Sequence, residues 1–167
     1  MPDRVDEILA QWKRERPDLD TTPMALIGRI QRATAALRPL LDKTHEESGL
    51  QGDSFDVLAS LRRSGPPFQL TPTELYREMM LTSGAMTNRI DKLEAAGLVQ
   101  RRPDPNDRRG TLVRLTAKGR ALIDAATTKH VANEERLLSV LAPREQQQLT
   151  ELLRKLLAGL GDTSLPS

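Results

Sequence analysis

The stretch from Leu81 to Gly119 constrains the fold of this chain more than any other segment. It is predicted to form a helix over residues 83–96 that leads without a gap into a β-hairpin, with strands at 99–102 and 111–115. Gly97 is placed to end the helix, and residues 103–107 supply turn-forming side chains between the strands. The tip of the hairpin is rich in arginine. This composition is typical of a DNA-reading helix followed by a wing.

Positive charge is concentrated around this hairpin. Residues 98–120 contain seven basic and two acidic side chains, whereas the whole chain has a net charge of only +2. The rest of the chain is therefore net acidic. A local positive field of this kind suits a protein that binds phosphates on one face and stays soluble on the others.

The composition limits the other classes of function. The 167 residues suffice for one domain, and only 2% of them are aromatic, so we expect a core of aliphatic side chains on helices. The chain lacks cysteine, and its two histidines, His45 and His130, have no ligand-like spacing, which argues against disulfides, a metal site and a cofactor. Without an apolar run of membrane length or a signal-peptide pattern, the chain is expected to be soluble and cytoplasmic.

Apolar spacing and helix-capping residues predict the remaining elements. The residues from Thr71 to Glu74 have the form of a capping box with Pro72 at the first helical position, and two short helices joined by a tight turn make a helix-turn-helix unit. The expected fold is mainly α with a small β-hairpin wing (α+β). Helices are expected at residues 3–16, 22–47, 53–63, 71–80, 83–96, 116–141 and from 143 onward.

The last of these helices carries a broad leucine stripe, and no later element could cover it. Its members recur at helical spacing: Leu149, Leu152, Leu153, Leu156, Leu157 and Leu160. We therefore expect this face to need a partner. The chain divides into N-terminal helices (1–50), a winged helix-turn-helix unit (51–119) and C-terminal dimerisation helices (120–167).

The candidate DNA-contacting residues lie on the reading helix and at the wing tip. Small and amide side chains at the start of the helix suit a major groove, and arginine on a thin hairpin suits a narrow minor groove. Taken alone, each set could also be a solvated surface. The candidates are Ser83, Gly84, Thr87, Asn88, Arg108 and Arg109, and Asp107 is expected to pair with an arginine and fix the shape of the tip.

The wing motif resembles that of the MarR family of bacterial transcription regulators. The similarity rests on Gly97-Leu98-Val99, on Asp104-Pro105-x-Asp107-Arg108-Arg109-Gly110 and on Val113-x-Leu115-Thr116-x-x-Gly119, and it extends over essentially the whole chain. The resemblance implies a homodimer that binds a palindromic operator in double-stranded DNA. It also implies that Arg109 is the minor-groove arginine, with Asp107 as its structural partner.

The N-terminal segment around the only tryptophan is similar to the urate-responsive subgroup of that family, which includes relatives that respond to citrate or trans-aconitate. That similarity implies a ligand-binding set of Trp12, Asp56, Arg89 and Arg101. Arg89 is expected at the margin of the core face, where either Asp56 or an anionic ligand could supply its counter-charge. Other interpretations stay open: Asp56 as a helix cap, Trp12 as core packing, and Arg101 as a phosphate contact.

These observations favour a ligand-responsive DNA-binding regulator, a repressor released from its operator by a small anionic metabolite. The alternative is a winged-helix module that binds DNA or protein without an effector. An enzyme is disfavoured, because the sequence has no catalytic grouping of histidine with serine or carboxylate and no nucleotide-binding glycine loop.

Overall fold

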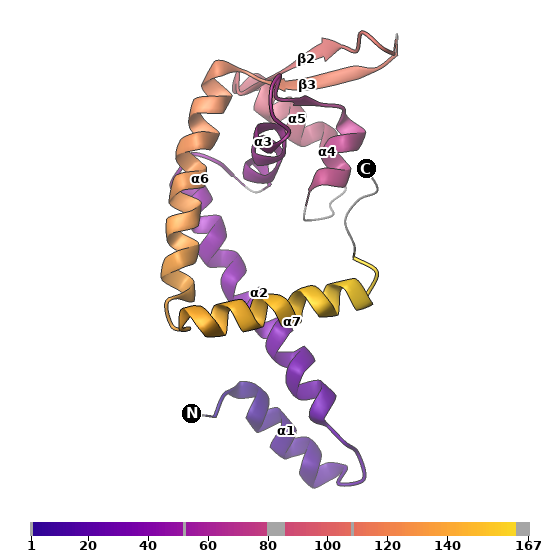
Figure 1. Cartoon of the computed structure of the whole chain (residues 1–167), viewed down its shortest axis with the longest axis vertical. Coiled ribbons are helices and arrows are strands. Elements are labelled where there is room, and N and C mark those ends of the chain that lie inside the picture. Colours follow the sequence, from indigo (N-terminus) through magenta and orange to yellow (C-terminus); the bar gives the residue numbers. More distant parts are fainter. Residues whose placement is uncertain (1, 52, 80–85, 108, 163–167) are drawn as a thin grey trace.

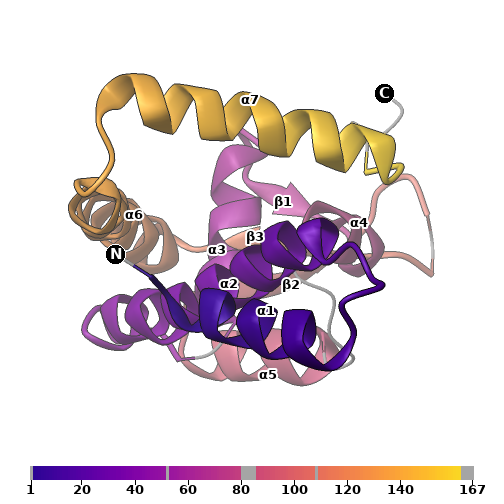
Figure 2. The same cartoon turned by 90° about the horizontal axis from the view of Figure 1, so that it is seen from below.

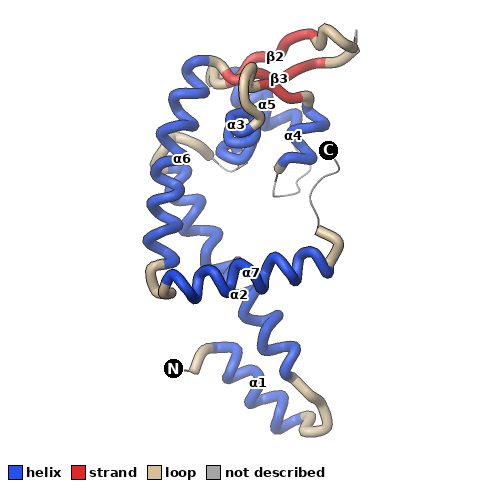
Figure 3. Tube along the Cα trace, in the orientation of Figure 1, coloured by secondary structure: helices blue, strands red, loops and turns tan. Residues whose placement is uncertain are grey.

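The structure is a computed structural model that describes residues 2–51, 53–79, 86–107 and 109–162. It is mainly helical with a small antiparallel sheet, which confirms the expected fold class (Figures 1 and 3). The helices are α1 (Arg4–Glu15), α2 (Thr22–Glu46), α3 (Ser54–Arg63), α4 (Pro72–Glu78), α5 (Met86–Ala95), α6 (Ala117–Leu138) and α7 (Pro143–Gly159), and the strands are β1 (Gln69–Leu70), β2 (Val99–Pro103) and β3 (Thr111–Leu115).

The elements between Ser54 and Leu115 form a winged lobe at one end of the molecule, with the β2–β3 hairpin projecting from it (Figure 1). Helix α1 lies at the opposite end, packed on the first half of α2. Helix α6 runs from the lobe alongside α2. Helix α7 crosses α2 in Figure 1 but lies apart from it in the view from below (Figure 2).

Local capping explains where two of the helices begin. The Asp3 carboxylate accepts hydrogen bonds from the backbone N–H groups of Val5 and Asp6 at 2.8 and 3.1 Å. The predicted capping box at α4 is confirmed, because the Thr71 hydroxyl accepts from the Glu74 N–H at 3.1 Å and the Glu74 carboxylate accepts from the Thr71 N–H at 2.7 Å. The starts of α1 and α4 are thus each fixed by a pair of residues three positions apart, Asp3 with Asp6 and Thr71 with Glu74.

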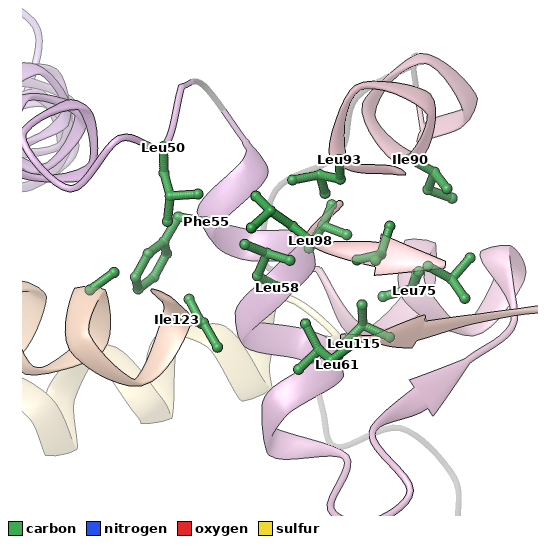
Figure 4. Close-up of a cluster of buried hydrophobic side chains, with 14 of the residues drawn as sticks. Leu50, Phe55, Leu58, Leu61, Leu75, Ile90, Leu93, Leu98, Leu115 and Ile123 are labelled. Atoms are coloured by element: carbon green, nitrogen blue, oxygen red, sulfur yellow. The ribbon is translucent and has the colours of Figure 1, made fainter. Parts of the chain in front are cut away.

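The core of the lobe surrounds α3. Val57, Leu58 and Leu61 on this helix are fully buried and pack with apolar side chains from the other elements of the lobe and from α6 (Figure 4). The partners on the reading helix are Ile90 and Leu93. As expected from the composition, the cluster is mostly aliphatic: Leu50, Phe55, Val57, Leu58, Leu61, Leu75, Met79, Ile90, Leu93, Leu98, Val99, Val113, Leu115, Ile123 and Ala126.

The sheet has the strand order β1-β3-β2 and is antiparallel throughout. The two predicted hairpin strands are present, and Val99 pairs with Leu115 at the base of the wing. The third strand, β1, was not predicted from the sequence. It contains two residues only, too few to show the alternation of apolar and polar side chains by which a strand is recognised.

The junction between the wing and α6 depends on Thr116 and Gly119. The Thr116 hydroxyl caps α6 by accepting from the Gly119 N–H at 3.0 Å, and it donates to the Gly97 carbonyl at 2.8 Å. Gly119 is buried, and a Cβ atom at this position would lie 2.0 Å from the Leu98 carbonyl oxygen. The close approach of two backbones therefore requires glycine at 119.

Replacing Gly119 with alanine should destabilise the protein. The added methyl group would overlap a backbone atom that cannot move aside, so we expect a loss of about 1–3 kcal/mol or more in the free energy of unfolding. Urea denaturation, monitored by circular dichroism, measures the free energy of unfolding. Gly159→Ala is the matched control, because a Cβ atom added at Gly159 would have nothing within 4 Å. Equal stability of the Gly119→Ala variant and the wild type would contradict the conclusion that the two backbones approach too closely for a side chain at position 119.

Candidate nucleic-acid interface

Helix α5 presents one face to the core and the other to solvent. Ile90 and Leu93 are buried, and Met86 packs against the core beside them. Thr87 and Asn88 are exposed. Both are predicted DNA contacts, and both lie where a major groove could reach them. Ser83 and Gly84, the other two candidates on this helix, lie outside the described residues.

The wing is tied to α5 by Arg101 on β2. Its backbone N–H donates to the Glu94 carboxylate at 2.7 Å, and its guanidinium forms ion pairs with both Glu94 and Asp91. These carboxylates lie one turn apart on α5, and they hold the pKa of Arg101 above its usual value through hydrogen bonding. Arg101 therefore fixes the position of the wing relative to the reading helix.

A short set of hydrogen bonds shapes the wing tip. The Asp107 carboxylate accepts from the backbone N–H of Arg109 at 2.9 Å, and the Asp107 carbonyl accepts from the Gly110 N–H at 2.8 Å. A Cβ atom at Gly110 would lie 2.9 Å from Cβ of Asp104, so the turn favours glycine there. The Asp107 carboxylate bonds to the backbone of Arg109, and the Arg109 side chain is exposed. Arg108 lies outside the described residues.

Arg89 lies between the two faces of α5. Its side chain is only 14% exposed and forms an ion pair with Asp53 through Nη2, while its Nη1 is buried without a hydrogen-bond partner. Burial, together with the nearby Arg38, lowers the pKa of Arg89. A guanidinium in this position has unused capacity to bind an anion.

A hollow of about 430 Å³ lies beside Arg89, between the start of α3 and the side of α5 that carries Asn88 and Lys92. Its charged side chains are Asp53, Arg89 and Lys92. The remaining lining residues are polar or aliphatic: Gly49, Leu50, Gln51, Ser54, Asn88, Leu93, Ala96 and Leu98. Two cations against one carboxylate make this hollow suitable for a small anion.

Asp53 is the residue that the sequence did not reveal as part of this site. It was expected only to open a helix, yet its side chain makes no capping hydrogen bond to α3. Instead it bridges Arg89 and Arg38, accepting from Arg38 Nη2 at 3.2 Å, and Arg38 Nε in turn donates to Asp42 at 3.0 Å. Arg38 and Arg89 lie 15 and 36 positions from Asp53 in the sequence. Local spacing therefore does not indicate that these three side chains meet.

The structure does not bring the four predicted ligand-binding residues together within one protomer. Of these four, only Arg89 lines the hollow. Asp56 is half-buried on α3, where burial raises the pKa of its carboxyl group and the nearby Arg38 opposes that effect. Trp12 is 38% exposed on α1, which lies at the end of the molecule opposite α5 (Figure 1). The assignments of Trp12, Asp56 and Arg101 to a ligand site therefore stay predictions.

Comparisons with known proteins agree with this geometry. Residues 48–110 match the family model described as MarR family. Over 149 residues the chain is 39% identical to the HTH-type transcriptional regulator PecS of Dickeya dadantii, which covers 89% of this chain and 90% of PecS. The chain belongs to the MarR family.

Solved structures of family members share the fold. A mutant MarR from E. coli complexed with operator DNA gives a TM-score of 0.70 at 29% identity, with 82% of this chain and 97% of that chain covered. A MarR family regulator from Streptomyces coelicolor in complex with DNA gives a TM-score of 0.74 at 25% identity, with 85% of this chain and 89% of that chain covered. This member of the MarR family is accordingly a DNA-binding transcriptional regulator and not an enzyme. Among the described residues, no helix has the length and apolar character needed to span a membrane.

Replacing Arg109 with alanine should weaken binding to the operator without unfolding the protein. Arg109 is exposed at a tip that the Asp107 hydrogen bond keeps in shape, so the change removes a charge and leaves the hairpin intact. We expect a loss of about 1–3 kcal/mol in binding free energy, about 5- to 150-fold in affinity, and a shallower dependence on salt. Fluorescence anisotropy with labelled operator DNA measures the affinity and its dependence on salt concentration.

The matched control is Arg14→Ala, which removes an exposed arginine from the last turn of α1, at the other end of the molecule. Its operator affinity should equal that of the wild type. An unchanged affinity of the Arg109→Ala variant would show that the wing tip does not contact DNA.

Proposed function

We propose that this MarR-family regulator is a homodimeric repressor of a palindromic operator. Each protomer would place α5 in a major groove and its wing in the neighbouring minor groove, with the half-sites about one helical turn apart. The exposed Thr87 and Asn88 on α5 and the exposed Arg109 on a shaped hairpin support this arrangement. Ser83, Gly84 and Arg108 would complete the contact surface. Such a regulator acts in the cytoplasm.

The observation that carries the proposal of effector control is the unpaired Nη1 of Arg89. A buried guanidinium nitrogen without a hydrogen-bond partner is costly, and a ligand that supplies oxygen atoms would satisfy it. Because Arg89 is part of the reading helix, an anion bound there would act directly on the DNA-contacting element. The effector class is a small organic anion such as urate, citrate or trans-aconitate, and its binding would release the operator.

The other predicted ligand-binding residues would contribute in different ways. Asp56, one turn along α3 from Asp53, would sense the charge of the anion, and Arg101 could reach it only by giving up part of its bonding to α5. Trp12 would join the site only if a second protomer brings its α1 to the hollow. Residues 1–50 and 120–167 would therefore serve both dimerisation and ligand binding.

Exposed apolar side chains support the dimer. No residue of α7, a helix that the structure describes in full, is buried. Leu152 on this helix is 65% exposed, and Leu160, which directly follows it, is 73% exposed. A hollow of about 470 Å³ between α1 and α2 is lined largely by apolar side chains, among them Ile8, Met24 and Ile27. Apolar surfaces of this extent on a water-exposed protein indicate a protein interface.

A second candidate function is a winged-helix module without an effector, which binds DNA or protein only. The observation in its favour is that the cations of the proposed site already have carboxylate partners: Asp53 pairs with Arg89, and Asp91 and Glu94 pair with Arg101. In this case the ion pairs would be structural, and no anion would alter DNA binding.

Replacing Leu152 with glutamate should dissociate the dimer. A charge within the leucine stripe cannot be buried without a counter-ion, so association should be weakened by several kcal/mol. Sedimentation velocity should show monomers at micromolar concentration, and operator affinity should fall because the two half-sites are no longer read together. The control, Ala158→Glu, places the same charge on the opposite face of α7 and should leave the dimer intact. A dimeric Leu152→Glu variant would exclude α7 from the interface.

Titration with urate, citrate and trans-aconitate tests effector control. Each anion is added to the protein bound to labelled operator, and in parallel to the free protein while Trp12 fluorescence is followed. We expect at least one anion to release the operator at millimolar or lower concentration, with a change in Trp12 fluorescence if α1 lies near the site. Full retention of the operator with all three would favour the module without an effector.

A further inference from the structure

The C-terminal end of the reading helix α5 is closed by residues that belong to the start of α6. The helix itself ends in a tight turn, in which Gly97 has a φ of 69° and the Leu98 N–H donates to the Leu93 carbonyl at 2.9 Å. The carbonyl groups of Ala96, Gly97 and Leu98 follow the last hydrogen bonds of the helix. They are therefore left for donors from outside α5.

All three of these carbonyl groups accept hydrogen bonds from the first turn of α6 or from its capping residue. The Lys118 ammonium donates to the Ala96 carbonyl at 2.8 Å. Thr116 donates its hydroxyl to the Gly97 carbonyl at 2.8 Å and its N–H to the Leu98 carbonyl at 3.1 Å. A cation at the C-terminal end of a helix is favourable, because the negative ends of the peptide dipoles meet there. Lys118 is thus the charged member of a joint between α5 and α6.

Other contacts hold the first turns of α6 against the rest of the winged lobe. The Asp124 carboxylate accepts from Arg62 Nε on α3 at 2.6 Å. The Arg120 guanidinium lies 4.7 Å from the ring centre of Phe68, which directly precedes β1. Beyond these turns α6 leaves the lobe, runs alongside α2 and leads to α7 (Figure 1). One end of α6 is therefore fixed to the lobe, and the other end leads into the proposed dimerisation region.

We propose that Lys118 is a positioning residue that fixes the angle between α5 and α6, and thereby the spacing of the half-sites that the dimer recognises. This inference rests on the proposed homodimer and palindromic operator, and it requires no effector. Lys118 acts on DNA binding through α5, because its nitrogen is already bound to the Ala96 carbonyl. In a dimer joined through α6 and α7, this joint sets the position of each reading helix relative to the partner.

A small change of angle at this joint is enough to alter the spacing. Helix α6 has 22 residues and is therefore about 33 Å long. Rotating such a helix by about 6° moves its far end by about 3.4 Å, which is the distance between successive base pairs of DNA. A joint that distinguishes half-sites one base pair closer or farther apart must therefore resist rotations of this size. Hydrogen bonds to three successive carbonyl groups, one of them from a charged donor, provide that restraint.

The test compares Lys118→Met with Lys129→Met in the full-length protein. Both substitutions remove one positive charge from α6 and keep an unbranched side chain. Lys129 is the matched control, because it is exposed and forms no hydrogen bond or ion pair with the described part of the chain. An operator is first selected from random DNA with the wild type, and versions with one base pair inserted or deleted at its centre are then prepared. Fluorescence anisotropy measures the affinity for each DNA and its dependence on salt concentration.

We expect Lys118→Met to lose affinity for the selected operator and to keep most of the affinity for the two altered ones. A cation at a helix C-terminus changes an equilibrium by about two- to fivefold, so the preference for the selected spacing should fall by a factor in that range. The dependence on salt should stay as in the wild type, because the Lys118 bond is to a carbonyl group and not to a phosphate. Lys118→Arg keeps a cationic donor and should restore part of the preference, and Lys129→Met should match the wild type.

The outcomes separate this role from its rivals, and circular dichroism confirms that each variant is folded. Lys118 is exposed, so a direct phosphate contact is the main rival. Equal losses on all the DNAs with a shallower dependence on salt would identify such a contact and overturn the inference. Equal losses with an unchanged dependence on salt would show a general structural role and overturn it as well.

A preference for the selected spacing that Lys118→Met shares with the wild type would also overturn the inference, as would the same loss of preference in Lys129→Met. The proposed homodimer and palindromic operator are tested by the wild type alone. They fail if the selected DNA contains no repeated half-site or if the wild type binds all three spacings equally. The inference about Lys118 then fails with them.

Discussion

The burial of one face of α5 is the constraint on which the rest of the site depends. Ile90 and Leu93 are anchored in the core around α3, so the helix cannot rotate freely about its axis. Their burial leaves Thr87 and Asn88 in solvent, available to a groove. It also forces Arg89, between the two faces, into a position where most of its side chain is shielded from water. The exposure of the two side chains proposed to contact DNA and the burial of a charge are thus two consequences of the same packing.

Ion pairs connect this anchored helix to its neighbours on two sides. Arg101 joins it to the wing through Asp91 and Glu94, and Asp53 joins Arg89 to Arg38 on α2. The first link is partly exposed and makes the wing move with the helix. The second spans two elements far apart in the sequence and depends on a single carboxylate. A change at that carboxylate therefore reaches the reading helix and the long helix together.

Sequence reasoning predicted the features that depend on near neighbours in the chain. The capping box at Thr71, the hairpin strands and the leucine stripe of α7 all follow from spacing over a few residues. The bridge from Asp53 to Arg89 could not be predicted, because it joins the start of one helix to another helix 36 positions later, and Asp53 and Asp56 are chemically equivalent candidates in the sequence. The two-residue strand β1 was too short to show a pattern.

Neighbouring positions on α5 explain how a ligand could control DNA binding without touching DNA. Successive helical residues are about 100° apart and are joined rigidly through one peptide, and Asn88 and Arg89 both line the hollow. Any movement of α5 that gives Arg89 a better anion partner must also move Asn88 relative to the groove. Because Arg101 ties the wing to the same helix, Arg109 would move as well. A small shift at one buried guanidinium would thereby move both surfaces that are proposed to contact DNA.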